Sequence, residues 1–281
     1  MKFIHLTDPH IVARPQKIFD LDVHARLEAA IASINANFAD AELCMVTGDI
    51  SHWGEPDSYG EFVEILNGLT IPWHPLIGNH DARATMRAAL PDAPWTDEGF
   101  LQYALETSAG EFLVLDTLDD GRNTGYLCEK RLRWLRERLL ETQDQGRDVF
   151  LFMHHPPFDS GIHAMDMIGM RNKPDLAAVV QGFAHIRHLF FGHLHRTCHG
   201  SWNGLPFSTV KATSHQVATV LGDASPLVCS TENPAYAVAL IDRDTVVIHD
   251  HSYMEEDTAF VYDRGVPKGQ DAPPEHQKSW S

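Results

Sequence analysis

The chain has 281 residues, which suffices for one large α/β domain or for an ordinary domain with a smaller addition. Its hydrophobic fraction of 43% and charged fraction of 22% are typical of globular proteins, so the composition excludes general disorder. Thirty-nine acidic and twenty-two basic side chains give a net charge of -17, which repels polyanions. We therefore expect neither long nucleic acid nor a membrane as a partner.

The apolar runs and the cysteines further limit the class of protein. No uninterrupted apolar run approaches the roughly 20 residues that cross a bilayer, and the first residues lack a charged leader, so we expect a cytoplasmic protein. The four cysteines are scattered without a CxxC pair, which argues against disulfides and thiolate zinc sites. Histidine is enriched, at 18 residues, and imidazole is the commonest metal ligand.

The first two thirds of the chain alternate between strand and helix patterns, which indicates an α/β (α+β) fold. Apolar runs predict strands at residues 2–6, 43–47, 73–77, 149–153 and 187–191, and a hairpin that joins 101–106 to 111–115. Apolar residues at helical spacing predict helices whose apolar faces include residues of the ranges 23–38, 62–69, 132–139 and 176–183. Asp57 or Ser58 is expected to cap the second helix, and Pro174 to begin the fourth.

From Leu205 onward the pattern changes to short strands, predicted at residues 207–210, 216–220, 235–241 and 245–249. We therefore expect a core at residues 1–204, a β-rich completion or cap at 205–262, and a flexible tail at 263–281. The tail is rich in Pro, Gly, Gln and charged residues and has no hydrophobic periodicity.

Polar blocks interrupt the ends of five predicted strands. In the first block, the two-residue period of an extended chain is expected to send Asp8 and His10 to the same side. In the second block, a glycine without Cβ lets backbone and metal approach closely. The blocks are, in chain order, Thr7-Asp8-Pro9-His10, Gly48-Asp49, Gly78-Asn79-His80-Asp81, His154-His155-Pro156-Pro157 and Gly192-His193-Leu194-His195.

Each block alone has a plain structural explanation. Asp8 and Asn79 are common turn formers, Asp49 resembles an ordinary loop start, and a pair of histidines before two prolines suits a rigid loop. Five compatible blocks after five successive core strands favour convergence instead, because ligands gather at the carboxyl ends of strands in open α/β sheets. Mixed nitrogen and oxygen donors suit Zn, Fe, Mn or Co in a catalytic site rather than a zinc finger.

The same blocks match the scattered pattern D-x-H, G-D, G-N-H-[DE], H and G-H-x-H, and over about residues 1–200 the chain resembles the calcineurin-like metallophosphoesterases. A narrower resemblance is to the bacterial class III cyclic-nucleotide and glycerophosphodiester phosphodiesterases. It rests on Thr7-Asp8-Pro9-His10, on His154-His155-Pro156-Pro157 with Met165-Asp166, and on Ser214-His215-Gln216.

The resemblance implies a four-layer α-β-β-α sandwich of two mixed sheets flanked by helices, and a centre of two divalent metal ions (Fe, Mn, Zn or Co). It implies that Asp49 bridges the two ions and that His80 acts as the main catalytic side chain beside them, on the phosphate or the leaving oxygen. One ion is expected on Asp8, His10, Asp49 and His195, and the other on Asp49, Asn79, His154 and His193. Relatives also often form homo-oligomers through their later segments, here 205–262.

Two further histidines are candidates for substrate binding beside His80. His52 stands where relatives often carry Asn or Asp, so the resemblance does not define the substrate pocket at this position. His215 faces the substrate by resemblance, although a lone histidine between strands is as often a structural hydrogen-bond donor.

The function implied is hydrolysis of a small phosphodiester, either a glycerophosphodiester or a 3',5'-cyclic nucleotide, by a hydroxide that two metals activate. A phosphomonoesterase with the same metals is the alternative enzyme. A protein-binding scaffold without catalysis is the alternative of another class, and the complete set of expected ligands argues against it.

Overall fold

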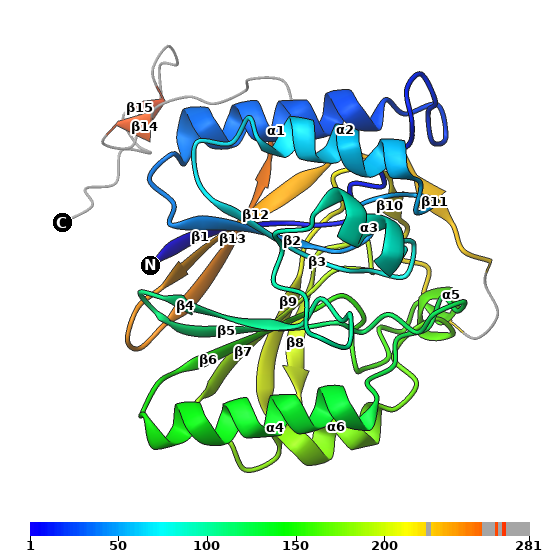
Figure 1. Cartoon of the computed structure of the whole chain (residues 1–281). Coiled ribbons are helices and arrows are strands. Elements are labelled where there is room, and N and C mark those ends of the chain that lie inside the picture. Colours follow the sequence, from blue (N-terminus) through cyan, green and yellow to red (C-terminus); the bar gives the residue numbers. More distant parts are fainter. Residues whose placement is uncertain (223–225, 255–261, 264–265, 268–281) are drawn as a thin grey trace.

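Two β-sheets lie face to face between two layers of helices in the computed structural model, which describes residues 1–222, 226–254, 262–263 and 266–267 (Figure 1). The predicted four-layer α-β-β-α sandwich is confirmed. Among the described residues, no helix combines the length and the apolar character needed to cross a membrane.

The first sheet has the strand order β13-β12-β1-β2-β3. Its parallel strands come from the start of the chain, and β12 joins β1 in antiparallel register, so that the last long strands complete a sheet begun by the first. The strands are β1 (Lys2–Leu6), β2 (Leu43–Thr47), β3 (Trp73–Leu76), β12 (Ala235–Ile241) and β13 (Val246–Ser252). On this side of the molecule lie α1 (Val23–Asn37), α2 (Pro56–Leu66) and α3 (Arg83–Ala89) (Figure 1).

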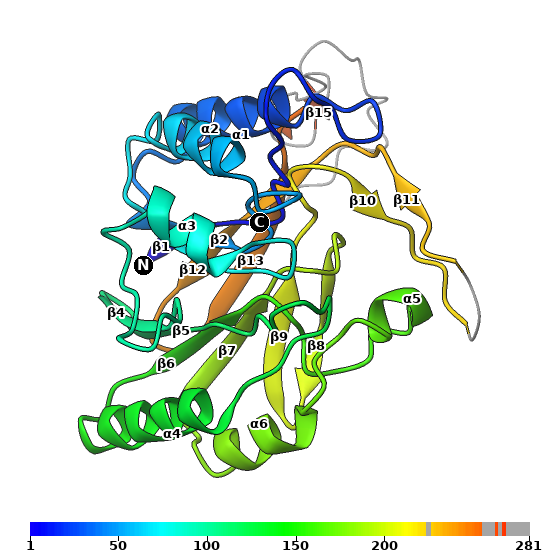
Figure 2. The same cartoon turned by 45° about the vertical axis from the view of Figure 1, so that its right-hand side comes forward.

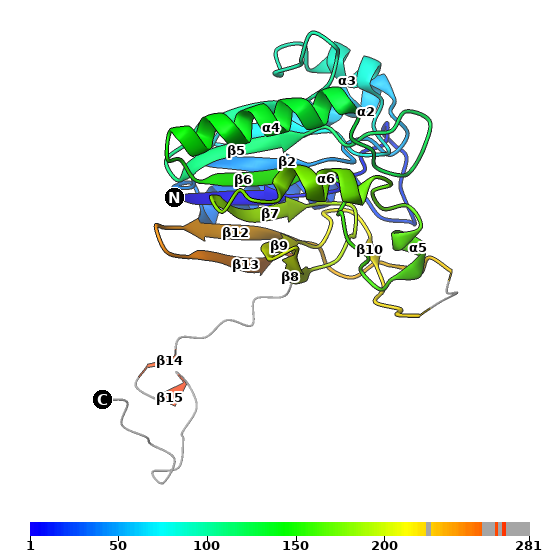
Figure 3. The ribbon, with the colours of Figure 1, turned by 90° about the horizontal axis from the view of Figure 1, so that it is seen from below.

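The second sheet has the order β4-β5-β6-β7-β9-β8, and its outer face is covered by α4 (Glu129–Asp144) and α6 (Lys173–Val180), which lie along its strands when seen from below (Figure 3). The strands β5, β6, β7 and β9 run parallel. The six strands are β4 (Tyr103–Thr107), β5 (Gly110–Leu115), β6 (Val149–Met153), β7 (Ile186–Phe191), β8 (Cys198–Trp202) and β9 (Leu205–Thr209).

Short elements lie at the margins of the sandwich. The pair β10 (Gln216–Val217) and β11 (Cys229–Ser230) projects from the body on the same side as α5 (His163–Asp166) (Figure 2). A further antiparallel pair is formed by β14 (Tyr262–Asp263) and β15 (Val266–Pro267).

The central strands β5, β6 and β7 are mostly apolar because both of their faces are buried. In β5, Phe112 and Val114 belong to the core between the sheets, whereas Leu113 and Leu115 pack in the core under α4 and α6. From the opposite sheet, the ring of Phe3 meets those of Phe112, Phe152 and Phe190 edge to face, at centroid distances of 5.1, 5.7 and 5.2 Å. Aromatic packing thus joins the two sheets.

The sequence predicted the long elements well and the short ones poorly. The capping residue predicted for the second helix was wrong. Helix α2 begins at Pro56, after Glu55, whose side chain makes no capping hydrogen bond. The Ser58 hydroxyl donates to the Glu55 carbonyl instead. Helix α6 begins at Lys173, one residue before Pro174. The polar edge strand β8 carries little apolar alternation, and it was missed together with α3, α5 and β11.

The division of the chain at residues 204 and 205 stays a prediction. Strands β8 and β9 pair as a hairpin across this point, while β12 supports the expected β-rich completion by joining the first sheet. The tail predicted at 263–281 falls outside the described residues except for Asp263 and the two residues of β15.

Replacing Phe3 by alanine tests the packing between the sheets. Phe3 is fully buried among three aromatic rings, so we expect Phe3→Ala to lower the free energy of unfolding by about 3–5 kcal/mol. Denaturant titration measures the change, and Leu140→Ala, which removes an exposed side chain of α4, is the matched control. A loss below about 1 kcal/mol for Phe3→Ala would contradict the packing described.

The buried His188, which lies within β7 and outside the polar blocks, is expected to make the stability of the protein depend on pH. Burial, with a further contribution from His199, lowers the pKa of His188 to about 4 from 6.5. Below pH 6.5 the unfolded chain binds a proton at this residue that the folded chain does not, so stability falls between pH 6.5 and 4. We expect His188→Gln, which can still donate to Ser208, to flatten this fall by about 1–3 kcal/mol in urea titrations at several pH values. An unchanged pH dependence would contradict the assignment.

Candidate metal centre

The five polar blocks follow β1, β2, β3, β6 and β7, and all of them meet at one edge of the sandwich. The placement predicted from parallel strands is therefore correct. Every residue expected at the centre lies in this cluster or against it.

The first group of donor atoms consists of one atom each from Asp8, His10, Asp49 and His195, all within 4.8 Å of one another and all buried. The Nε2 atom of His10 lies 3.0 Å from Nε2 of His195 and 3.5 Å from Oδ2 of Asp49. The same nitrogen of His195 lies 3.5 Å from Oδ1 of Asp8. This is the quartet that the family resemblance implies for one ion.

The second group is built around His154. Its Nε2 atom lies 3.3 Å from Oδ2 of Asp49 and 3.1 Å from Oδ1 of Asn79. The ring of His193 is 5.1 Å from that of His154, and its Nε2 atom is buried without a hydrogen-bond partner in the described part of the chain. A buried nitrogen without a partner is costly unless a cation takes its lone pair.

The hydrogen bonds behind the rings orient lone pairs into the cluster. Nδ1 of His154 lies 2.8 Å from the carbonyl oxygen of Thr47, and Nδ1 of His195 lies 2.8 Å from that of His215. A carbonyl accepts only from N–H, so each neutral ring carries its proton on Nδ1 and its lone pair on Nε2. Lone pairs then face carboxylate and amide oxygens, an arrangement that a divalent ion satisfies. The donor set therefore fits two such ions that share Asp49.

Burial and neighbouring charges oppose each other in this cluster. Burial raises the pKa of Asp49, but His154 and His80 outweigh it and hold the pKa well below its ordinary value. Burial lowers the pKa of His154, but the Asp49 carboxylate outweighs it and raises the pKa to about 9, so an ion bound at Nε2 would take the place of a proton. For His193, burial and two imidazole neighbours act together and hold the pKa well below 6.5, which keeps its lone pair free at neutral pH.

Backbone conformation at the centre differs from the extended chain that the sequence suggested. Asp8 and His10 both have positive φ, so an alternating strand is the wrong reason for their convergence, although they do converge. Such backbone costs on the order of 1–3 kcal/mol per residue and concentrates at functional sites. The positive φ angles at the centre are 51° for Asp8, 46° for His10, 48° for Asp49, 68° for His193 and 47° for His195.

Glycines let the loops pack closely. A Cβ atom on Gly48 would lie 2.6 Å from Nδ1 of His154, and one on Gly78 would lie 2.2 Å from Oδ1 of Asp49. The close approach predicted at Gly48 is therefore present, but the atoms it admits belong to His154 and to the backbone of Gly78.

A chain of donors beneath Asp8 was not foreseen from the sequence. Nε2 of His5 lies 2.8 Å from the Thr47 hydroxyl, which donates to the Thr7 hydroxyl at 2.7 Å. The Thr7 hydroxyl in turn donates to Oδ2 of Asp8 at 2.6 Å. Thr7 stands in the first polar block, and only the fold reveals its two partners.

Asp81, the last residue of the third block, anchors the loop after β2. Its carboxylate accepts from the backbone N–H groups of Ile50, Ser51 and Gly78, at 3.2, 3.0 and 2.9 Å, and from the Tyr59 hydroxyl at 3.0 Å. Burial and the nearby Asp49 carboxylate raise the pKa of Asp81 to about 6. Asp81 therefore positions the backbone that carries Asp49.

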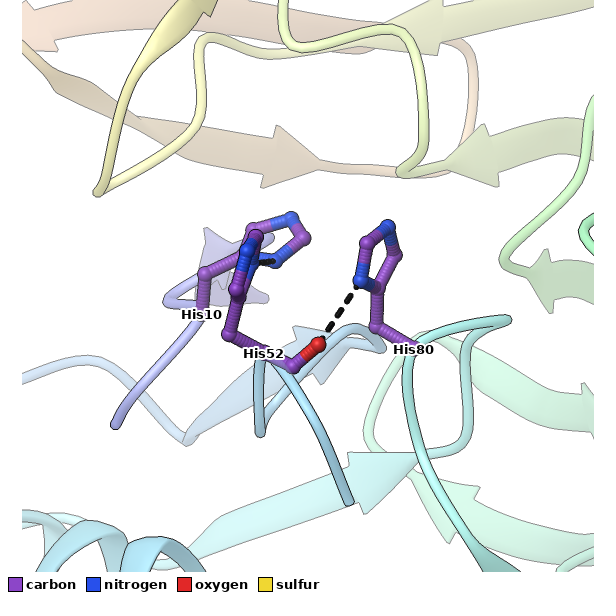
Figure 4. A group of neighbouring side chains, drawn as sticks. All are labelled: His10, His52 and His80. Atoms are coloured by element: carbon purple, nitrogen blue, oxygen red, sulfur yellow. Dashed lines mark hydrogen bonds between the residues drawn. The ribbon is translucent and has the colours of Figure 1, made fainter. Parts of the chain in front are cut away.

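Three imidazoles from the loops that follow β1, β2 and β3 lie side by side (Figure 4). Nδ1 of His10 lies 3.0 Å from Nδ1 of His52, and Nδ1 of His80 lies 2.9 Å from the carbonyl oxygen of His52. The backbone N–H of His80 donates to Oδ1 of Asp49 at 2.8 Å. His80 and His52 thus border the first group of donors and line the approach to it.

His215 and His155 complete the surroundings. The ring of His215 lies 4.4 Å from that of His195 and 5.3 Å from that of His10. His155 is close to His193, at 4.7 Å, but its nitrogens already face the Thr117 hydroxyl at 2.8 Å and the Asn123 carbonyl at 3.2 Å. His155 is therefore held by protein groups, whereas His215 stands at the edge of the centre.

Known proteins resemble the chain along most of its length. A probable cyclic nucleotide phosphodiesterase of Rhodopseudomonas palustris is 39% identical over 262 residues, which cover 92% of this chain and 95% of the relative. A probable glycerophosphodiester phosphodiesterase GpdQ of Arcobacter nitrofigilis is 30% identical over 221 residues, which cover 78% and 80%.

The fold has solved counterparts as well. The crystal structure of a dimetal phosphatase from Danio rerio superposes with a TM-score of 0.69 at 14% identity and covers 90% of this chain and 96% of its own. Residues 1–197 match the family model described as calcineurin-like phosphoesterase. The chain belongs to the calcineurin-like phosphoesterase family.

Proposed function

We propose that this protein hydrolyses small phosphodiesters with two divalent metal ions. One ion would be held by Asp8, His10, Asp49 and His195, and the other by Asp49, Asn79, His154 and His193. When bound, such a pair supplies a nucleophilic water at neutral pH and neutralises charge on the phosphoryl oxygens.

The observation that carries this proposal is the convergence of buried lone pairs. The Nε2 atom of His193 has no hydrogen-bond partner among the described residues, and the Nε2 atoms of His154 and His195 are turned inward by hydrogen bonds from Nδ1 to carbonyl groups. Purely structural histidines are expected to satisfy both nitrogens within the protein, as His155 does. The contrast between His155 and the neighbouring His193, whose Nε2 lacks a partner among the described residues, supports a ligand role for His193.

His80 is the proposed catalytic side chain. Its Nδ1 donates to the His52 carbonyl, which fixes the ring and leaves Nε2 to meet the substrate (Figure 4). From there it can bind a phosphoryl oxygen or exchange a proton with the leaving oxygen. Its backbone N–H holds Oδ1 of Asp49, so the same residue helps to orient the bridging carboxylate.

His52 and His215 are proposed substrate contacts at the edge of the centre. The Nδ1 atom of His52 is occupied by His10, so its Nε2 is the atom that can reach a substrate. The carbonyl of His215 holds His195, and its side chain packs beside His10. Both residues therefore combine a supporting contact with an edge that remains for substrate.

The printed functions of two relatives support a diester as the substrate. They are named as a probable cyclic nucleotide phosphodiesterase and a probable glycerophosphodiester phosphodiesterase, both of which act on small phosphodiesters by name. Fe, Mn, Zn and Co remain the candidate metals, because nitrogen and oxygen donors accept all of them.

A homo-oligomer in the cytoplasm completes the proposal. Exposed apolar side chains around β10 and β11 support association of subunits: Val220, Leu221, Leu227 and Val228. Sedimentation of the full chain measures the oligomeric state directly.

Metal restoration tests the proposed reaction. We expect metal-stripped protein to regain hydrolysis of bis(p-nitrophenyl) phosphate with Mn, Zn, Co or Fe, and to prefer this diester to p-nitrophenyl phosphate. Asp49→Ala should lose at least one of two bound ions and reduce kcat at least a hundredfold, because both groups of donors share this carboxylate. A preference for the monoester would indicate a phosphatase, and normal turnover in Asp49→Ala would contradict the centre.

Replacing His80 separates catalysis from metal binding. We expect His80→Ala to retain two ions per chain by metal analysis and to lower kcat for the diester by about 10²–10⁴-fold, the range of general acid–base catalysis. Leu140→Ala, which truncates an exposed side chain of α4, serves as the mutational control. Full kcat in His80→Ala would exclude this residue from the chemical step.

A further inference from the structure

A strained turn presents an exposed aromatic ring at the edge of the metal centre. Ile18 and Leu21 exchange backbone hydrogen bonds at 3.3 and 2.8 Å, which leaves Phe19 and Asp20 as a two-residue turn. Both central residues have positive φ, 51° and 63°, at positions where Asn and Gly are the favoured residues. A bulky side chain rarely adopts this backbone, and the strain points to a role for the ring.

Packing in the core does not explain Phe19. Its side chain is 57% exposed, and its ring meets His215 edge to face at a centroid distance of 4.9 Å. Since the side chain gains little from burial, a glycine would serve the turn better. The aromatic residue therefore adds backbone strain to the turn, and its ring lies directly beside His215 at the edge of the centre.

A second exposed aromatic ring stands beside His52. Trp53 is 65% exposed, and its ring lies 4.2 Å from that of His52. The segment that carries it is firmly held: the His52 N–H donates to the Ile11 carbonyl at 2.9 Å, and the Gly54 N–H donates to the Ser51 hydroxyl at 2.8 Å. The indole is thus presented to solvent from a fixed backbone.

The two exposed rings mark the ends of one row of rings that passes through the centre. His10 contacts His52 through its Nδ1 edge, and its Nε2 edge faces His195, on which His215 packs. Ring centroids along the row lie 4.9 Å apart for Phe19 and His215, 5.3 Å for His215 and His10, 5.1 Å for His10 and His52, and 4.2 Å for His52 and Trp53.

We propose that Phe19 and Trp53 form an aromatic rim that selects phosphodiesters whose alcohol carries a nucleobase. This inference rests on the proposed diesterase function and narrows its substrate class. A planar heterocycle stacks on aromatic faces, and every base has such a face, whereas a glycerol-based alcohol has none. Because hydrogen bonds already hold the backbone that carries each ring, less conformational entropy is lost when the base binds.

The experiment compares two diesters on the metal-loaded full chain: 3',5'-cyclic AMP, which carries a base, and glycerophosphoethanolamine, which does not. We expect Trp53→Leu to raise KM for the cyclic nucleotide between about fivefold and a hundredfold, the effect of losing one base stack, with kcat within about twofold. KM for glycerophosphoethanolamine should change less than about twofold, and Trp53→Phe should restore most of the loss.

Phe19→Gly gives the second and sharper arm, because it removes the ring and the backbone strain together. We expect its Tm to stay within about 2 °C of the original or to rise, since glycine suits positive φ, while KM for the cyclic nucleotide increases. Leu140→Ala, an exposed apolar side chain on α4, should change neither substrate.

Equal changes for both diesters, or none, would overturn the aromatic rim and leave the diesterase function intact. Loss of an oligomer in the two variants without a change in relative KM would likewise overturn it, since the rings would then serve an interface. If no metal supports hydrolysis of either diester, the proposed function fails. Binding of AMP to the metal-loaded protein then tests the aromatic rim separately. Weaker binding of AMP in both variants would support the rim, and unchanged binding would overturn it.

Discussion

The buried carboxylate of Asp49 is the constraint on which the rest of the structure depends. It is 2% exposed, and its Oδ2 atom faces His10 from the first sheet and His154 from the second, at 3.5 and 3.3 Å. An uncompensated charge at this depth would cost several kcal/mol. Compensation comes from imidazoles on separate loops and from the N–H of His80, so the loops of both sheets must close around one side chain.

The supporting contacts follow from that requirement. Asp81 holds the backbone N–H groups of Ile50 and Ser51, directly after Asp49, and that of Gly78 in the loop after β3. The lack of a side chain at Gly78 leaves room for the Asp49 carboxylate. Positive φ at five proposed ligands indicates that loop conformation has been set by the centre rather than by local preference. The aromatic layer that contains Phe3 holds the sheets together beneath these strained loops. Stability of the layers therefore offsets strain at the edge.

Much of this could be read from the sequence, because both the strands and the polar blocks are local patterns. Runs of five mostly apolar residues located β1, β2 and β6 to within a residue, and each block began where a strand ended. The supporting groups were not predictable in this way. His5 and Thr47 are 42 residues apart in the sequence and meet across two neighbouring strands, so no local pattern predicts their contact. The exposed rings of Phe19 and Trp53 likewise acquire meaning only beside His215 and His52.

The most direct measurement is anomalous diffraction from crystals of the full chain soaked in Mn²⁺. We expect two peaks about 3.5–4 Å apart, with the Asp49 carboxylate between them and His193 Nε2 as a ligand of one ion. A single peak, or two peaks that Asp49 does not bridge, would contradict a shared dimetal centre at these strand ends.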